Sequence, residues 1–247
     1  MRERRFSMQQ YFVNHKLTID MEIEMTQEQS HHISTVLRMT KGKIIRLADI
    51  SGFLFYGSIQ INNTGVRVKV TQAIAQQRES KVDITLAVAL IKGERWDWML
   101  EKATECGASK IVPFISSRCV VKDKPETAQR KLERYRKILT EAAEQSYRHI
   151  IPTITEPVSL KQLINHKSKQ NFVAYEKEDS CYLYDVHDEI SSVTIVIGPE
   201  GGFSDDEVDY LTNHGFTSVS LGKRIFRAET AAIAACIMLD TLGERHD

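Results

Sequence analysis

The stretch Val196-Ile-Gly-Pro-Glu-Gly-Gly-Phe-Ser-Asp-Asp-Glu207 decides the fold of this chain. Its apolar start is typical of a buried parallel strand, and Ser204 with Glu207 forms a capping box that predicts a helix directly after it. In open α/β sheets ligands bind where strands end, and the glycines of Gly198-Pro-Glu-Gly-Gly202 let backbone approach a ligand closely. The stretch by itself predicts either a ligand-binding loop or a tight turn without a ligand.

A second stretch, Leu221-Gly-Lys-Arg-Ile-Phe-Arg-Ala-Glu-Thr230, repeats the order of strand, loop and helix. Its loop carries three basic residues and one acid, and the small-residue helix expected at 231–239 suits either a core position or a dimer face. Gly-x-Gly-x-x-Gly after a strand, Gly-x-x-x-x-Gly-Lys-Ser/Thr and Gly-x-Ser-x-Gly are all missing. A common dinucleotide fold, a phosphate loop and a serine hydrolase are therefore disfavoured.

The composition is that of a globular chain, with 247 residues of which 42% are hydrophobic and 27% charged. Residues 1–148 hold 25 Lys and Arg against 17 Asp and Glu, whereas residues 149–247 hold 8 against 16. An anionic partner is therefore expected at the first part of the chain, although clustering on solvated helix faces would give the same pattern. The four cysteines form no Cys-x-x-Cys pair, so we expect reduced thiols and no metal site. The longest apolar run, 231–239, is too short to cross a bilayer, so we expect a soluble, cytoplasmic protein.

Residues 1–76 are predicted to form a small, mostly antiparallel barrel. Alternating apolar and polar residues at 17–25 predict a half-buried strand, and Thr26 with Gln29 forms a capping box for a short helix that ends near Gly42. Three further strand patterns follow, at 43–50, 53–61 and 66–75. The polar segment 76–81 marks the domain boundary.

Residues 77–247 alternate between strand and helix patterns, which predicts an α/β domain with a parallel sheet. An apolar strand at 83–91 precedes a helix with Trp96, Met99, Leu100 and Ala103 along one stripe and Gly107 at its end. The other elements expected before the glycine-rich strand are short strands at 110–115 and 118–121, a long helix at 126–147, a short helix at 160–164 and a strand at 172–175.

The motifs Ile197-Gly-Pro-Glu-Gly-Gly-Phe-Ser-x-x-Glu207 and Leu221-Gly-x-Arg-Ile-x-Arg-x-Glu-Thr-Ala231 resemble the paired signature of the RsmE-type 16S rRNA uridine methyltransferases, members of the SPOUT superfamily. Upstream segments such as Ala89-Leu-Ile-Lys-Gly-Glu-Arg95 and Glu144-Gln-Ser-x-Arg148 are similar as well. The resemblance implies a PUA-like RNA-binding barrel over 1–76 and a trefoil-knotted SPOUT methyltransferase domain over 77–247. It also implies a homodimer, S-adenosyl-L-methionine as cofactor, and methylation of N3 of a uridine near the 3′ end of 16S rRNA in the assembled small ribosomal subunit.

The resemblance also implies where the cofactor lies. The residues expected around it are Tyr175, Glu176, Gly198, Pro199, Glu200, Gly201, Gly202, Leu221, Gly222, Arg224, Ile225, Phe226, Arg227 and Thr230.

Methylation of uracil N3 requires loosening of a weakly acidic imide proton and stabilisation of the negative charge that develops. Arg118 and Arg227 are the catalytic candidates, with Glu200 and Glu229 as alternatives for the base or an orienting group. Contact with phosphate or an ion pair between subunits would explain the arginines equally well, and helix capping the glutamates. RNA contacts are expected from surface residues beside the pocket, namely Lys92, Arg95, Lys102 and Arg148.

Two alternatives remain at the level of function. One is a SPOUT methyltransferase that modifies another rRNA or tRNA position, such as a ribose 2′-hydroxyl. The other is an RNA-binding assembly factor without turnover. Both glycine loops and Arg227 are intact, which favours an enzyme.

Overall fold

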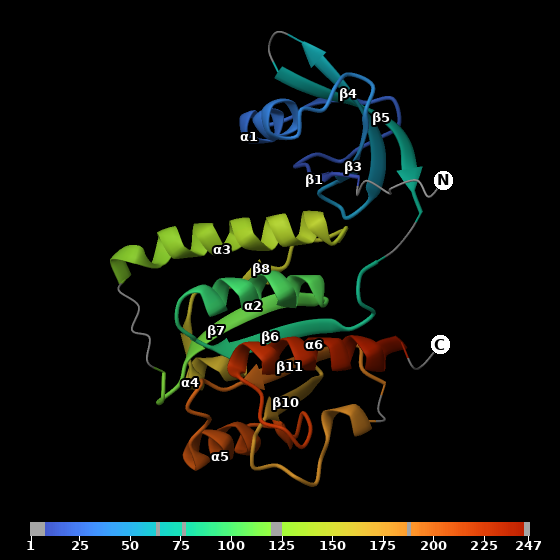
Figure 1. Cartoon of the computed structure of the whole chain (residues 1–247). Helices are drawn as coiled ribbons and strands as arrows, with labels where there is room; N and C mark the ends of the chain where they lie inside the picture. Colours follow the sequence, from blue (N-terminus) through green and yellow to red (C-terminus); the bar gives the residue numbers. More distant parts are fainter. Residues whose placement is uncertain (1–7, 63–64, 76–77, 120–124, 187–188, 245–247) are drawn as a thin grey trace. The chain divides into compact units, whose positions relative to one another are not determined.

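The structure of the protein is a computed structural model that describes residues 8–62, 65–75, 78–119, 125–186 and 189–244. The chain divides into two compact units (Figure 1). The first consists of Met1–Glu79 with Ala143–Ile150, and the second of Ser80–Ala142 with Ile151–Asp247. Each unit has a hydrophobic core of its own.

The first unit is built on a five-stranded sheet in the order β1-β3-β4-β5-β2. Only the β1–β3 pair is parallel. Alternate residues of the strands, among them Ile45, Leu47 and Ile59, point into the core. The strands predicted at 43–50, 53–61 and 66–75 are confirmed. The strand bounds are β1 Gln10–Phe12, β2 Glu22–Glu24, β3 Ile44–Ala48, β4 Leu54–Asn62 and β5 Gly65–Ile74.

The predicted strand at 17–25 forms only at its end, as β2. A turn in which Met21 N–H donates to Thr18 O, with Asp20 at φ 69°, interrupts it. The helix α1, Gln27–His31, starts with the predicted capping box at Thr26. It continues as one π-helical turn, His32–Val36, and stops before the predicted end because Arg38 takes a left-handed φ of 50°.

The segment Ala143–Ile150 belongs to the first unit because its polar groups are bound there. The Arg148 guanidinium forms an ion pair with Glu79 at 2.6 Å, and Gln10 Nε2 donates to Arg148 O at 2.6 Å. Glu79 Oε1 also accepts the N–H groups of His149 and Ile150. The predicted domain boundary, which divides the chain once at residue 76, leaves this segment out of the first unit. Arg148 is 5% exposed, so its prediction as a surface residue for RNA contact is wrong.

Replacing Glu79 with glutamine is expected to lower the free energy of unfolding by about 2–3 kcal/mol at pH 7, because Arg148 loses the anion that compensates its buried charge. Burial raises the pKa of Glu79, but Arg148 and the two N–H groups outweigh it, so the folded-state pKa lies below the ordinary 4.5. The contribution of Glu79 is therefore complete above pH 4.5 and is lost as the pH falls through the folded-state pKa.

Urea unfolding of wild type and E79Q between pH 3 and 7 measures this difference. The matched control is E24Q, whose carboxylate is paired with Arg67 on the exposed surface, and we expect it to change stability by less than about 0.5 kcal/mol. A difference between wild type and E79Q that stays constant down to pH 3 would show that Glu79 acts without its charge.

The second unit is an α/β domain whose sheet is entirely parallel and runs β12-β10-β11-β6-β7-β8, with β9 also paired to β7. Residues of β6 are buried on both faces, as its apolar run predicts. The strand bounds are β6 Asp83–Ala89, β7 Ala108–Ile115, β8 Thr153–Ile154, β9 Val158–Ser159, β10 Gln170–Ala174, β11 Ser192–Ile197 and β12 Thr217–Val219.

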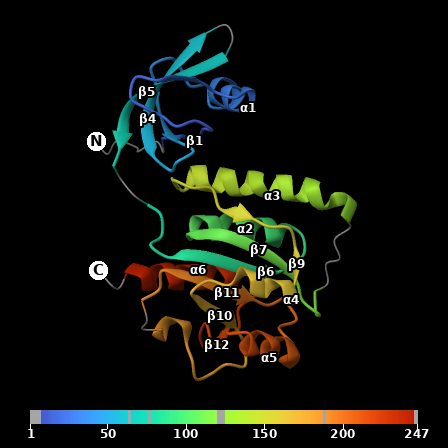
Figure 2. The same cartoon turned by 180° about the vertical axis from the view of Figure 1, so that it is seen from behind.

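Helices cover both faces of this sheet (Figures 1 and 2). The helices α2 (Glu94–Glu105), α3 (Pro125–Gln145) and α6 (Ala228–Glu244) share a core with one face, and α4 (Leu160–Leu163) and α5 (Asp205–Asn213) share a core with the other. The predicted stripe of α2, from Trp96 to Ala103, is buried against the sheet. The predicted strand at 118–121 does not form at its start, because Arg118 and Cys119 lie in a turn in which Cys119 N–H donates to Ser116 O. Its other two residues lie outside the described residues.

Three further features of the described residues concern membranes, metal ions and thiols. No helix is long and apolar enough to cross a membrane. No group of three or more His, Cys, Asp or Glu side chains is placed to hold a metal ion. All four cysteines have free thiols, and Cys236 is buried.

Candidate active site

Three neighbouring strands of the second unit, β12, β10 and β11, end at the same edge of the sheet. The loops that follow them surround a cavity of about 910 Å³. It lies outside the carboxyl ends of the strands, where α/β sheets place ligands. The cavity brings together every residue predicted to hold a cofactor except Thr230, which is exposed on the first turn of α6 and does not line it.

The first wall of the cavity is the loop between β11 and α5, residues 198–203. Its turn is closed by the Gly202 N–H, which donates to Pro199 O at 2.9 Å. Gly202 has a φ of 68°, and a β-carbon there would collide with the Glu176 carboxylate. Only glycine suits this position without strain. The predicted capping box between Ser204 and Glu207 is present and starts α5 at once.

The turn after β7 supports this loop from behind. Arg118 Nη1 donates to Gly201 O at 3.0 Å and to Phe203 O at 3.1 Å. Ser117 N–H donates to Glu207 Oε1 at 2.8 Å. Burial raises the pKa of Glu207, but the N–H groups of Ser204 and Ser117 outweigh it and the pKa is lowered, so the carboxylate stays charged. Arg118 does not itself line the cavity, and its visible role is to position the loop.

The second wall follows β10 and was only partly anticipated. Tyr175 donates its hydroxyl to Asp205 at 2.6 Å, which raises the pKa of Tyr175. Glu178 accepts the Ser180 hydroxyl at 2.6 Å and the N–H of Ser180, which lower its pKa to about 2. These bonds order the loop. The lining residues of this wall that the sequence did not reveal are Ala174, Glu178, Asp179 and Tyr182. Their place at or after the end of β10, beside the glycine loop, was the available signal.

The third wall is the loop between β12 and α6, residues 220–227. Ser220 N–H donates to Cys181 O at 2.7 Å, which holds the start of this loop against the second wall. Arg227 O accepts the N–H of Ala231 at 2.8 Å, so the backbone of Arg227 is fixed at the start of α6. Its side chain is exposed at the cavity, and among the described residues its guanidinium has no hydrogen-bond or ion-pair partner.

Two glutamates were candidates for a base, and the structure separates them. Glu200 lines the cavity and forms an ion pair with Arg95 at 2.9 Å. Glu229 is buried, does not line the cavity, and its Oε2 has no hydrogen-bond partner among the described residues. Of these two candidates, Glu200 is therefore the one whose carboxylate can reach a ligand in the cavity.

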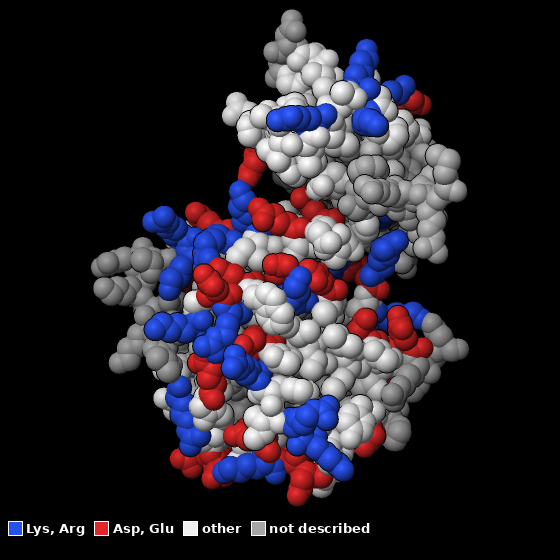
Figure 3. Space-filling model, viewed as in Figure 1, with Lys and Arg blue, Asp and Glu red and all other residues white. Residues whose placement is uncertain are grey.

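The predicted RNA-contacting residues of the second unit lie on or beside α2. Arg95 lines the cavity, and Lys92 is exposed just before the helix. Lys102 pairs with Glu101 at 2.7 Å and Glu105 at 2.8 Å, and these hydrogen bonds raise the pKa of Lys102. An RNA contact by Lys102 would compete with these two carboxylates. On the face shown in Figure 3, basic and acidic side chains are interspersed in the same way.

Comparisons with known proteins agree with this architecture. Residues 78–240 match the family model of an RNA methyltransferase domain. The chain is 35% identical over 243 residues to the ribosomal RNA small subunit methyltransferase E of Bacillus subtilis (strain 168), with 92% of this chain and 94% of the relative covered. It is 33% identical to that of Rickettsia conorii, with 94% and 95% covered.

Solved structures give the same result. The ribosomal RNA small subunit methyltransferase E of Neisseria gonorrhoeae, crystallised with S-adenosyl methionine, superposes with a TM-score of 0.87 at 27% identity, covering 95% of this chain and 98% of that one. A methyltransferase from Legionella pneumophila in complex with the same cofactor superposes with a TM-score of 0.86 at 32% identity, covering 95% and 97%. The chain therefore belongs to the ribosomal RNA small subunit methyltransferase E family.

Proposed function

We propose that this protein is a cytoplasmic S-adenosylmethionine-dependent methyltransferase that modifies N3 of a uridine near the 3′ end of 16S rRNA in the assembled small subunit. The observation that carries the proposal is the cavity at the ends of β10, β11 and β12, in a chain of this family. There, glycine backbone lies beside Arg227, whose guanidinium has no partner among the described residues. Its relatives are ribosomal RNA methyltransferases by name, and two neighbours were solved with this cofactor.

The residues present fit S-adenosylmethionine. The cavity of about 910 Å³ is in the size range of sites for drug-sized ligands. A β-carbon at Gly222 would meet none of the described atoms within 4 Å, so its backbone leaves room for a ligand. Glu176 and Asp179 line the cavity and offer negative charge to a cationic group. When bound, this cofactor supplies a methyl group on a sulfonium whose sulfur keeps the electron pair as the methyl leaves.

The chain's own residues would act on the uracil. N3 must be held toward the cavity while its proton is loosened, and the flanking carbonyl oxygens then gain negative charge. Arg227 is placed to stabilise that charge, because its backbone is fixed and its guanidinium is unpaired among the described residues. Glu200 is the candidate that takes the N3 proton, directly or through water. Its carboxylate is oriented by Arg95, whose Nη1 lies 2.9 Å from Glu200 Oε1.

Three finer features are part of the proposal. A trefoil knot is supported by the pairing of Ser220, the first residue after β12, with the segment 181–183, and by the packing of α6 on β6 and β11. A homodimer is supported by exposed apolar side chains on and before α6, Ile237 at 51% and Ile225 at 83% exposure. The mostly antiparallel sheet of the first unit is consistent with a PUA-like RNA-binding domain.

The proposed function predicts that purified protein transfers radiolabelled methyl from S-adenosylmethionine to small subunits that lack the modification. Mass mapping of nuclease fragments should then place 3-methyluridine near the 3′ end of 16S rRNA. Label on a ribose would show an enzyme of different specificity. No label in RNA despite saturable cofactor binding would show an assembly factor instead.

A further inference from the structure

A row of polar side chains crosses the parallel sheet at its amino edge, the edge opposite the active-site cavity. Its members, in sheet order, are Asn171, Thr194, Thr85, Lys110 and Thr153, each in register with the next. Side chains in register on parallel strands share a face. Two residues further along, the same face is apolar, with Ala87, Val112 and Val196 in one core. The row is therefore an abrupt change within an otherwise apolar layer.

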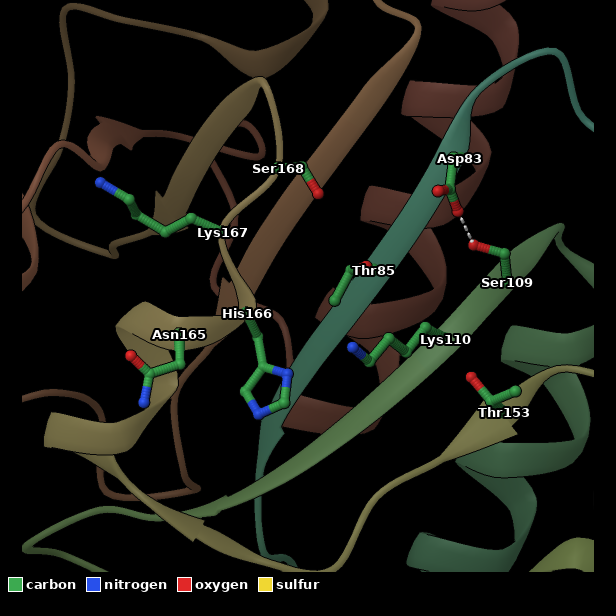
Figure 4. Close-up of a pocket in the computed structure, with 9 residues that line it drawn as sticks. All are labelled: Asp83, Thr85, Ser109, Lys110, Thr153, Asn165, His166, Lys167 and Ser168. Atoms are coloured by element: carbon green, nitrogen blue, oxygen red, sulfur yellow. Dashed lines mark hydrogen bonds between the residues drawn. The ribbon is translucent and has the colours of Figure 1, made fainter.

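A cavity of about 350 Å³ lies against three members of this row, Thr85, Lys110 and Thr153, with residues 165–168 on its other side. We call it the amino-edge cavity. Figure 4 shows the Lys110 side chain directed between Thr85 and His166. Asp83, the acid of the cavity, is turned toward Ser109 and accepts its hydroxyl. The Lys167 chain points away, and its amine donates to His214 O at 2.9 Å.

Among the residues that the structure describes, the hydrogen bonds of the row leave the side-chain donors of Lys110, Thr85 and the exposed Thr153 without a partner. Thr194 Oγ1 donates to His166 O at 2.7 Å and lies 2.9 Å from Ser168 Oγ, so it is satisfied. Lys110 is partly buried and Thr85 is 6% exposed. Within the described residues, neither the Lys110 amine nor the Thr85 hydroxyl has a hydrogen-bond or ion-pair partner. A bound anion at this place would gain a charge-assisted hydrogen bond from the Lys110 ammonium.

The neighbouring His166 imidazole is affected by Lys110 only in part, because burial is the larger cause of its pKa shift. Burial and the charge of Lys110 lower the pKa of His166, so the ring is neutral near pH 7 and can donate one N–H. An ammonium, a hydroxyl and an imidazole N–H then converge on one space, and the acid nearby is engaged with Ser109. Three converging donors suit an oxyanion with several acceptor oxygens, which is the chemistry of a phosphate group.

We propose that the amino-edge cavity binds one phosphate group, supplied by the RNA backbone when the protein is on its substrate. The RNA as source rests on the proposed function, whereas the phosphate chemistry rests on the cavity alone. The six residues of β11 separate the two edges by about 20 Å, which a short RNA hairpin spans. Such a contact fixes the register of the RNA without reading its sequence.

The test uses full-length protein and two probes, inorganic phosphate and a fluorescent RNA hairpin that contains the target uridine. K110Q removes the charge, and T85V removes the hydroxyl while keeping the shape. K161Q, on the exposed surface of α4 and outside the cavity, is the matched control. Thermal melts confirm that each variant is folded.

For wild type, phosphate should raise the pKa of His166 measured by NMR, and for K110Q it should not. K110Q should weaken RNA binding about tenfold and T85V about threefold, while K161Q stays within about twofold. The slope of log K against log salt should fall by about 1 for K110Q alone. A response of His166 to phosphate with unchanged RNA binding would identify free phosphate as the ligand.

The proposal is overturned if phosphate leaves the pKa of His166 unchanged and K110Q binds RNA as K161Q does. Methyl transfer by wild type, measured in parallel, separates this failure from failure of the proposed function. Transfer to rRNA, with no response at His166 and with K110Q binding RNA as K161Q does, would contradict only the phosphate site. A response at His166 without any methyl transfer would contradict only the proposed methyltransferase activity.

Discussion

Replacing Arg227 with alanine is expected to lower kcat for methyl transfer about 100- to 1000-fold while the Kd for S-adenosylmethionine changes less than about threefold. The guanidinium is exposed at the cavity and is unpaired within the described residues, and the Arg227 carbonyl anchors the start of α6. Alanine keeps that backbone bond and removes only the charge offered to the uracil. The effect therefore belongs to the transition state and not to cofactor binding.

Single-turnover kinetics and isothermal titration with the cofactor measure the two quantities separately. R227K keeps a charge but loses the planar fork of donors, so its rate should lie between those of wild type and R227A. Raising the pH should recover part of the rate of R227A, because N3 then ionises without help. Loss of cofactor affinity with an unchanged rate at saturation would contradict a catalytic role for Arg227.

Features set by a few consecutive residues could be predicted from the sequence. The capping boxes at Thr26 and Ser204 could be predicted, because each consists of four consecutive residues and the hydrogen bonds among them. The buried stripe of α2 and the apolar strand β6 follow from their periodicity in the same way. The glycine loop was predicted because the strand, the glycines and the capping box that form it are contiguous.

Features set by distant residues could not be predicted in this way. The alternation at 17–25 is compatible with a turn, since Leu17 and Ile23 are buried on either side of it. Arg148 looked like a surface cation because no local pattern shows that Glu79, far away in the chain, buries it. The segment around Arg148 joined the first unit for the same reason.

The two cavities of the second unit differ in the same respect: one is set mostly by consecutive residues and the other by distant ones. Most lining residues of the active-site cavity lie in three loops, two of which carry glycine-bearing signatures of their own. The amino-edge cavity depends on the register of β6, β7, β8 and β11, which brings Thr85 beside Lys110 and Thr194. Each member is an ordinary polar residue in the sequence. Their meaning as a group arises only when the strands pair.

Replacing Gly202 with valine is expected to raise the Kd for S-adenosylmethionine more than about 100-fold, a loss of about 2.7 kcal/mol in binding free energy. Gly202 has a φ of 68°, where a branched side chain is strongly strained, and its β-carbon would displace the Glu176 carboxylate that lines the cavity. The loop after β11 can relieve the strain only by leaving the conformation in which its backbone forms the first wall.

G215V is the matched control, because Gly215 has a φ of 87° and its β-carbon would lie 3.3 Å from the flexible end of Lys167, outside the active-site cavity. Both variants should lose thermal stability through the same backbone strain. Only G202V should lose cofactor affinity in isothermal titration, with G215V within about threefold of wild type. If folded G202V binds the cofactor as tightly as G215V does, the backbone at Gly202 is not part of the cofactor site, and the loop after β11 serves only as a strand-to-helix turn.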